Sequence, residues 1–254
     1  MLSFFLYLTK KIVYTSDLGN IHIDKYYSNT FEPITKCDLF IGETTYAGNE
    51  KIATNKVRKH DLEKLKSDIF FTCLENKSRL LIPVFAMDRC QNMLTHIYNL
   101  MANEKDFKNI PVYVDSPMAI NMCKQYYEIL EGEEAELWRK VLCWDNLHFV
   151  ESSEESKNIR DSKQPCVVLS SSGMIVPRGR SAGWACSMLP RVNDKIAFCG
   201  LVIAKSANLL ALVIHSFAFL ACSFLITSSG VIVSTYFSSD IFSCSSTNST
   251  PYSL

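Results

Sequence analysis

The sequence predicts an α/β protein in which a mostly parallel sheet is flanked by helices. Between residues 80 and 200, short apolar segments alternate with stretches of helix length, an order that is typical of parallel sheets covered by helices. Nearly half of the 254 residues, 48%, are hydrophobic and 20% are charged, so the chain is globular and not disordered.

Four apolar segments are the predicted strands of this sheet. A helix follows the first strand, with Asp88 expected to cap it and Met93, Ile97, Leu100 and Met101 on one side. A second helix is expected from Pro117 through Ile129. The strands are residues 80–86, 111–115, 165–170 and 195–200, an earlier helix covers 57–76, and the charged interval 131–163 is predicted as helix plus surface loop.

The first 50 residues are predicted to add three more strands. Residues 3–8 and 11–15 flank a short polar turn, as in a hairpin. Residues 38–43 form an apolar segment that ends on Glu43. Ligands collect beyond the carboxyl ends of strands in open α/β sheets, so the position of this carboxylate is of interest.

Charge and cysteine content exclude several classes of protein. Lys plus Arg (26) equals Asp plus Glu (26), so the chain has no global basic field and any RNA contact must be local. None of the ten cysteines forms a C-x-x-C pair, which indicates reduced structural thiols in a cytoplasmic protein. The five histidines show no metal-ligand spacing.

The character of the chain changes after Gly200. Residues 206–239 carry no charged side chain, and residues 209–226 nearly reach the length of a membrane span. His215 and several serine and cysteine residues interrupt that segment. A membrane span, a buried strand-rich tail and a non-native reading of a damaged gene all remain open interpretations.

Five segments, in this order, resemble the β-CASP family of metallo-β-lactamase-fold nucleases, which includes ribonuclease J and the cleavage-and-polyadenylation endonuclease. One such motif is weak evidence, but five in sequence between residues 10 and 200 are strong. The matching segments are residues 11–20, 37–48, 81–91, 111–119 and 170–175, the last followed by Gly179 and Arg180.

The resemblance implies a metallo-β-lactamase core that carries two zinc ions and a Rossmann-like β-CASP domain inserted as a lid, with RNA, possibly single-stranded, threaded between them. It divides the chain into a remnant of the core (1–48), the β-CASP domain (49–200) and a divergent apolar, Ser-rich tail (201–254). The family's histidine motifs would lie before Met1 and after Gly200. The chain is therefore expected to be truncated at both ends and not to bind zinc by itself.

Two carboxylates match functional positions of the family. Asp17 matches the carboxylate that bridges the two zinc ions, while its residue type alone also fits a turn-capping aspartate before Gly19. Glu43 matches the acidic residue that is proposed to support proton transfer to the leaving oxygen. Its simpler interpretation is an ordinary carboxylate at a strand end.

The best substrate feature is the loop containing Ser171, Ser172, Gly173 and Met174. Hydroxyls and exposed amides at the end of a strand form a nest for phosphate, to which Arg180 adds a charge-assisted fork. An ordinary turn of small residues is the alternative. Three other residues fall in matched loops: Arg89, Ser116, and Phe85, which suits either base stacking or the core.

Three functions follow from these observations. The first is a fragment of a zinc-dependent RNA-processing nuclease, inactive as written. The second is a non-catalytic module that binds RNA or protein, with homo-oligomers included among its partners. The third, a small-molecule-binding doubly wound domain, has no G-x-G-x-x-G or P-loop motif to support it.

Overall fold

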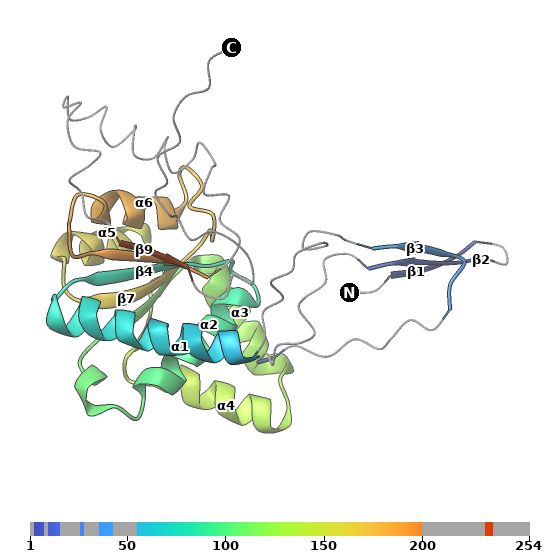
Figure 1. The fold of residues 1–254 in the computed structure, drawn as a ribbon, viewed down its shortest axis with the longest axis horizontal. Coiled ribbons are helices and arrows are strands. Elements are labelled where there is room, and N and C mark those ends of the chain that lie inside the picture. The colour runs from blue at the N-terminus through green and yellow to red at the C-terminus, as the bar shows by residue number, and fades with distance from the viewer. Residues whose placement is uncertain are drawn as a thin grey trace, which may run out of the picture.

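A computed structural model describes residues 3–7, 10–15, 26–27, 36–42, 55–199 and 232–235 of the chain. Within these residues the fold is α/β, with a mostly parallel sheet between helices, as the sequence predicts (Figure 1). The two residues on which the metal and acid predictions depend, Asp17 and Glu43, lie outside the described residues.

The main sheet has six strands in the order β6-β5-β7-β4-β8-β9, and every neighbouring pair is parallel. The central strands consist of consecutive apolar residues because both faces of the sheet are covered. The strands are β4 (Arg79–Pro83), β5 (Val112–Asp115), β6 (Leu147–Phe149), β7 (Cys166–Ser170), β8 (Lys195–Phe198) and β9 (Ile232–Thr235).

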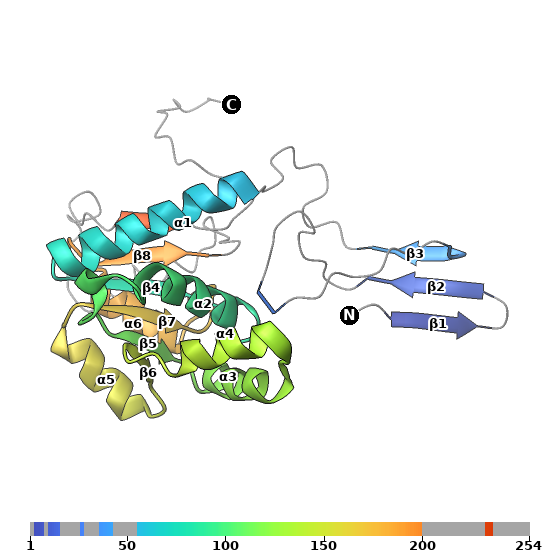
Figure 2. The same ribbon diagram turned by 90° about the horizontal axis from the view of Figure 1, so that it is seen from below.

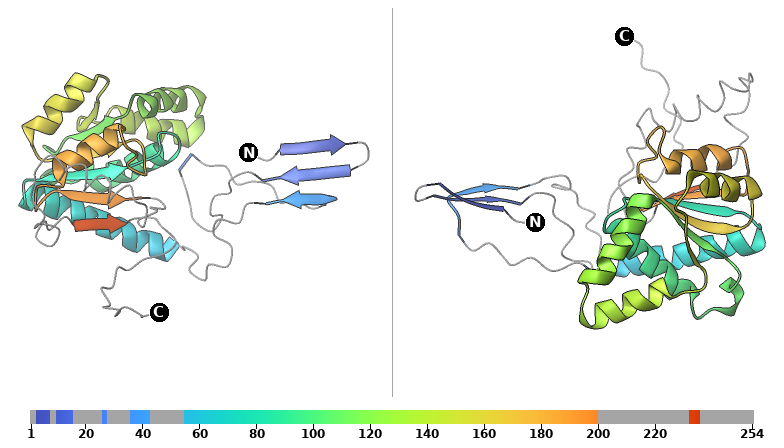
Figure 3. Two further views of the ribbon diagram at one scale, coloured as in Figure 1. Left: turned by 90° about the horizontal axis from the view of Figure 1, so that it is seen from above. Right: turned by 180° about the vertical axis from the view of Figure 1, so that it is seen from behind.

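Helices cover both faces of this sheet (Figures 1 and 3). One face carries α1 (Asn55–Ile69), which continues into the π-helix η1 (Phe70–Glu75), together with α2 (Arg89–Met101), α3 (Pro117–Ile129) and α4 (Gly132–Leu142). The other face carries α5 (Ser153–Ser162) and α6 (Arg180–Met188). A short 3₁₀-helix, η2 (Lys105–Phe107), precedes β5.

Alternate side chains of each strand enter the two cores. Leu80 and Ile82 of β4 pack toward α1 and α2, whereas Leu81 packs toward α6. Val167 and Leu169 of β7 follow the first pattern. This period of two divides the side chains of each strand between the two cores.

The three N-terminal strands form a separate small sheet (Figure 2). β1 (Ser3–Tyr7) and β2 (Lys10–Tyr14) pair antiparallel, so the predicted hairpin is confirmed. β3 (Leu39–Ile41) pairs parallel with β2, inside the segment that was expected to be a strand.

Two details differ from the sequence prediction. The interval 131–163 contains a strand, β6, besides α4 and α5. This strand has only three residues, and His148 in the middle interrupts the apolar pattern. Asp88 precedes α2 but makes no capping hydrogen bond, because its backbone is at φ 62° and its carboxylate instead accepts a bond from Asn92 Nδ2 at 2.9 Å. Ser116 and Ser152 do cap α3 and α5.

The tail is described only at residues 232–235, where β9 extends the sheet beside β8. The candidate span at residues 209–226 lies outside the described residues. Among the residues that are described, no helix has both the length and the apolar character needed to cross a bilayer.

A buried ion pair closes the amino edge of the sheet. The Arg79 guanidinium and the Asp194 carboxylate are both fully buried, and Arg79 Nε donates to Asp194 Oδ2 at 3.0 Å. Arg79 also donates to the hydroxyl and carbonyl oxygens of Ser187 and to the carbonyl of Arg160. One side chain therefore links β4 to α5, α6 and the start of β8.

A tyrosine pair from the early part of the chain lies against the helices. Tyr26 N donates to Asn92 Oδ1 at 3.0 Å, and the hydroxyls of Tyr27 and Thr95 are 2.8 Å apart. The Tyr27 ring meets that of Trp138 edge-on, with centroids 5.4 Å apart. Burial raises the pKa of Tyr27 to about 12, so the phenol stays neutral in this contact.

We expect Arg79→Met to lower the free energy of unfolding by about 3–5 kcal/mol, because the buried Asp194 carboxylate loses its buried cation and, of its ion pairs, keeps only the one with Arg191 at 3.3 Å. Urea denaturation at neutral pH measures this. The matched control is Lys66→Ala, which removes an ion pair with Glu104 whose side chains are about half exposed, and should cost less than about 1 kcal/mol. Equal effects of the two substitutions would contradict the assigned role of Arg79.

Candidate phosphate-binding site

The connections that leave the carboxyl edge of the sheet change sides at its centre, and we call the region beyond these strand ends the crevice. Pro83, Ser170 and Asp115 pair in one row across β4, β7 and β5, so the loops after these strands begin side by side. The chain leaves β4 and β5 toward α2 and α3 on one face, but leaves β7 toward α6 on the other. Neighbouring strands whose connections diverge in this way form the usual ligand crevice of open α/β sheets.

Two hydroxyls meet at the start of this crevice. Ser116 Oγ lies 2.6 Å from Ser171 Oγ and also accepts from Ala119 N, which caps α3. Pro117 at the first position of that helix has no amide hydrogen that needs a partner. The structure therefore brings together Ser116 and Ser171, which the sequence analysis placed in separate loops.

The β7–α6 loop has polar groups without partners. The carbonyl of Ser172 accepts from Ile175 N at 3.2 Å and from Ser181 Oγ at 2.8 Å, which folds the loop back on itself. Ser172 Oγ is buried and makes no hydrogen bond in the described part of the chain. Among residues 55–199, the amides of Ser172, Gly173 and Met174 donate no hydrogen bond either. Such amides suit an anion.

Gly173 allows this loop to approach the strand beside it. A Cβ atom at this position would lie 3.2 Å from the backbone nitrogen of Phe85 and 3.3 Å from the carbonyl carbon of Val84. Both contacts are with backbone, which cannot swing aside as a side chain can. Any residue larger than glycine would therefore push the loop away from the end of β4.

Arg180 has partners other than the phosphate that the sequence suggested. Its Nη1 donates to Asp115 Oδ1 and to the carbonyl of Val150 at 3.1 Å, and its Nη2 donates to the carbonyl of Glu151 at 2.9 Å. The side chain is 19% exposed. In this arrangement Arg180 fixes the end of the loop, and its contact with a ligand remains a prediction.

Sequence reasoning missed the group that organises this edge. Asp115 is fully buried, and its Oδ2 accepts from Trp184 Nε1 at 2.6 Å and from Ser156 Oγ. An aspartate that ends an apolar strand was the available signal. Its partners on α5 and α6 are far away in the sequence, so the pattern of residues did not reveal them.

Apolar and basic side chains border the crevice. Arg89 begins α2 and donates from Nη1 to the carbonyl of Cys199 at 3.1 Å. Phe85 is 44% exposed. It is therefore not a core residue, which was one of the two interpretations that the sequence left open. Other exposed residues of the same three loops and the start of α3 are Met87, Met118, Met174 and Val176.

The described residues do not fit a metal centre. They contain no group of three or more His, Cys, Asp or Glu side chains that could hold an ion. The eight described cysteines are free, and burial raises the pKa of Cys166 to about 12 and of Cys199 to about 11. The thiols of Cys166 and Cys199 therefore stay protonated at neutral pH, and these two residues are poor metal ligands and poor nucleophiles.

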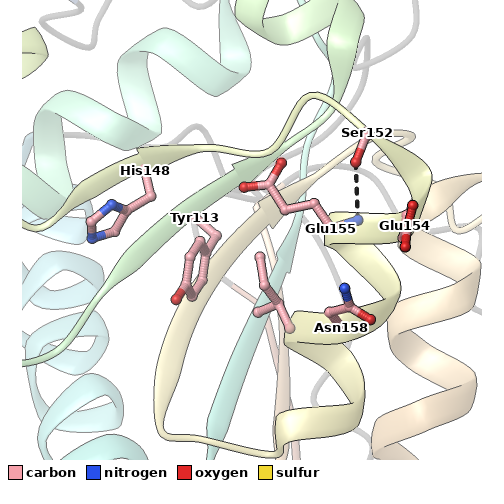
Figure 4. A pocket seen from close by; sticks show the side chains of 7 residues that line it. Tyr113, His148, Ser152, Glu154, Glu155 and Asn158 are labelled. Atoms are coloured by element: carbon pink, nitrogen blue, oxygen red, sulfur yellow. Dashed lines mark hydrogen bonds between the residues drawn. The ribbon is translucent and has the colours of Figure 1, made fainter.

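A separate pocket of about 510 Å³ lies beside β5, β6 and α5, and Figure 4 shows its lining. Ser152 Oγ accepts from Glu155 N at 3.0 Å there, which caps α5. Glu154 and Glu155 both line the pocket, so it disfavours a phosphate group.

Comparisons with known proteins agree with this fold. A model of the Beta-Casp domain matches residues 90–206. Ribonuclease TTHA0252 of Thermus thermophilus is 30% identical over 172 residues, covering 65% of this chain and 38% of that protein. An RNase J-like protein of Methanocaldococcus jannaschii is 29% identical, with the same two coverages.

A eukaryotic relative is more distant. Cleavage and polyadenylation specificity factor 73 of Drosophila melanogaster is 26% identical over 167 residues, which cover 65% of this chain and 23% of that protein. The chain thus spans less than two fifths of the length of each of these three relatives.

We expect Gly173→Ala to lower the free energy of unfolding by about 1–3 kcal/mol, since the added methyl group meets backbone atoms of Val84 and Phe85. Thermal or urea denaturation measures the change. Gly183→Ala is the control. Gly183 lies inside α6, and a methyl group there would be 3.6 Å from the guanidinium of Arg160, which is an ordinary contact. This substitution should stabilise the helix by about 0.5–1 kcal/mol. A neutral effect at Gly173 would show that the close approach is not a constraint.

Proposed function

The chain belongs to the β-CASP family of metallo-β-lactamase-fold nucleases, and we propose that its β7–α6 loop holds the phosphate backbone of RNA. The observation that carries this proposal is the group of unpartnered donors at the crevice, the amides of residues 172–174 and the Ser172 hydroxyl. We also propose the division into a core remnant (1–48), the β-CASP domain (49–200) and a tail (201–254).

The chemistry of the crevice suits a phosphodiester. Backbone amides and hydroxyls donate to phosphate oxygens without a full positive charge, which agrees with a chain whose charges balance. Arg89 begins the facing helix and adds one local cation. These donors bind a backbone and carry no base sequence information.

Exposed apolar side chains at the same edge support single-stranded RNA as the ligand. A base that is not paired can stack on an aromatic face, which Phe85 offers at 44% exposure. Met87 and Met174 are exposed on either side of the crevice and extend this surface. A duplex would hide its bases from these groups.

Cleavage is a separate proposal. The family acts through metal ions, and we propose that two zinc ions serve in the complete protein, with Asp17 and Glu43 as metal-bridging and acid positions. Because residues 55–199 do not fit a metal centre, we derive no step through zinc. We propose instead that this chain alone binds RNA in a reducing, cytoplasmic environment, which its free cysteines support, and does not cleave it.

We expect Phe85→Ala to weaken binding of a fluorescein-labelled single-stranded RNA by about 1–3 kcal/mol, or roughly 5- to 140-fold in Kd, through the loss of one stacked base. Fluorescence anisotropy at low salt measures Kd. Phe71→Ala is the matched control, because Phe71 is also exposed but lies on η1, away from the crevice, and its loss should leave Kd unchanged. Two equal effects would place RNA elsewhere.

We expect the purified chain to cleave no RNA in a chelator-sensitive way, with or without added zinc. A gel assay with labelled RNA measures cleavage, and elemental analysis of the dialysed protein gives an independent zinc content, expected to be well below one ion per chain. RNA cleavage that a chelator abolishes would refute the proposal of inactivity. It would leave the binding proposal standing, because binding is measured separately.

A further inference from the structure

We propose that Asp115 is a positioning residue that holds the β7–α6 loop in its RNA-binding shape, while making no contact with RNA itself. This inference rests on the proposed function of that loop. It goes further because it identifies what fixes the loop before any ligand arrives.

Both ends of the loop are attached to the end of one strand. At its start, Ser170 Oγ donates to the carbonyl of Asp115 at 2.9 Å, and Ser171 Oγ meets Ser116 Oγ. At its end, Arg180 forms an ion pair with the Asp115 carboxylate. The loop is therefore held at both ends by contacts with residues 115 and 116.

The Asp115 carboxylate is the shared acceptor of three side chains from two helices. It is fully buried and accepts from Arg180 and Trp184 of α6 and from Ser156 of α5. A buried carboxylate persists only when a cation and hydrogen bonds compensate its lost hydration. Arg180 supplies that cation, while Arg160 donates to Ser156 Oγ and extends the network.

The same contacts explain why Asp115 is not itself a ligand contact. Both of its carboxylate oxygens already accept hydrogen bonds, and no part of the side chain reaches solvent. A negative charge at the crevice surface would also repel phosphate. Its contribution is to keep the loop amides in place, so that binding does not have to order them.

The test compares Asp115→Asn with Asp68→Asn in RNA affinity and hydrogen exchange. Asp68 pairs with Lys195, at the start of β8 on the opposite edge of the sheet, so this control also removes one partner of a mostly buried ion pair. Both variants are measured at a temperature where denaturation curves show that they are folded. We expect Asp115→Asn to raise Kd for single-stranded RNA by about 3- to 10-fold.

The control should leave Kd within about twofold of the parent chain. Amides of residues 171–180 should exchange faster in Asp115→Asn and not in Asp68→Asn. The dependence of Kd on salt should keep its slope in Asp115→Asn, because no phosphate contact is removed. Arg180→Lys, which keeps the ion pair but loses the fork to two carbonyls, should fall between the parent and Asp115→Asn, and carries the test if Asp115→Asn does not fold.

Three results would overturn the inference. Unchanged Kd with faster loop exchange would make Asp115 a purely structural residue. A lower Kd with a steeper salt slope would mean that Arg180, once released, binds phosphate itself. If the parent chain binds no RNA, or if Phe85→Ala has no effect on binding, the proposed function fails first, and the exchange data then show only whether Asp115 anchors the loop.

Discussion

The register of β5, β7 and β4 is the constraint on which the rest of the molecule depends. Parallel pairing places Asp115, Ser170 and Pro83 in one row, so three loops start at the same height. A slip of one residue would turn every side chain of a strand to the opposite core and move the hydroxyls apart. The crevice is thus a consequence of strand pairing, and its chemistry is added by the loops.

Ion pairs with buried carboxylates lie at both the amino and the carboxyl edges of this sheet, and the indole of Trp184 contacts residues of both. Trp184 Nε1 bonds to Asp115 at the carboxyl edge, while the guanidinium carbons of Arg160 and Arg79 lie 5.9 and 6.0 Å from its ring centroid. Arg79 belongs to the ion pair at the amino edge. Cations near an aromatic face are stabilised when water is excluded. Trp184 therefore contributes both to the stability of the ion pair at the amino edge and to the shape of the site at the carboxyl edge.

The strands and helices of this domain could be predicted where the pattern is local. Apolar runs revealed β4 and β7, and the Ser-Pro sequence at 116–117 placed the start of α3. β6 was missed because its three residues, with His148 in the middle, are too short a segment to give a periodic signal. The partners of Arg180 were missed for another reason: Asp115 and Glu151 are distant in sequence, and only strand order brings them together.

The Tyr27 contact also joins an early part of the chain to residues that are synthesised after it. Its partners Thr95, Tyr126 and Trp138 all come later in the sequence, so the ribosome synthesises Tyr27 before any of them. Tyr27 can make these contacts only after α2, α3 and α4 have been synthesised and have packed together. The packing of Tyr27 therefore comes after the packing of these three helices.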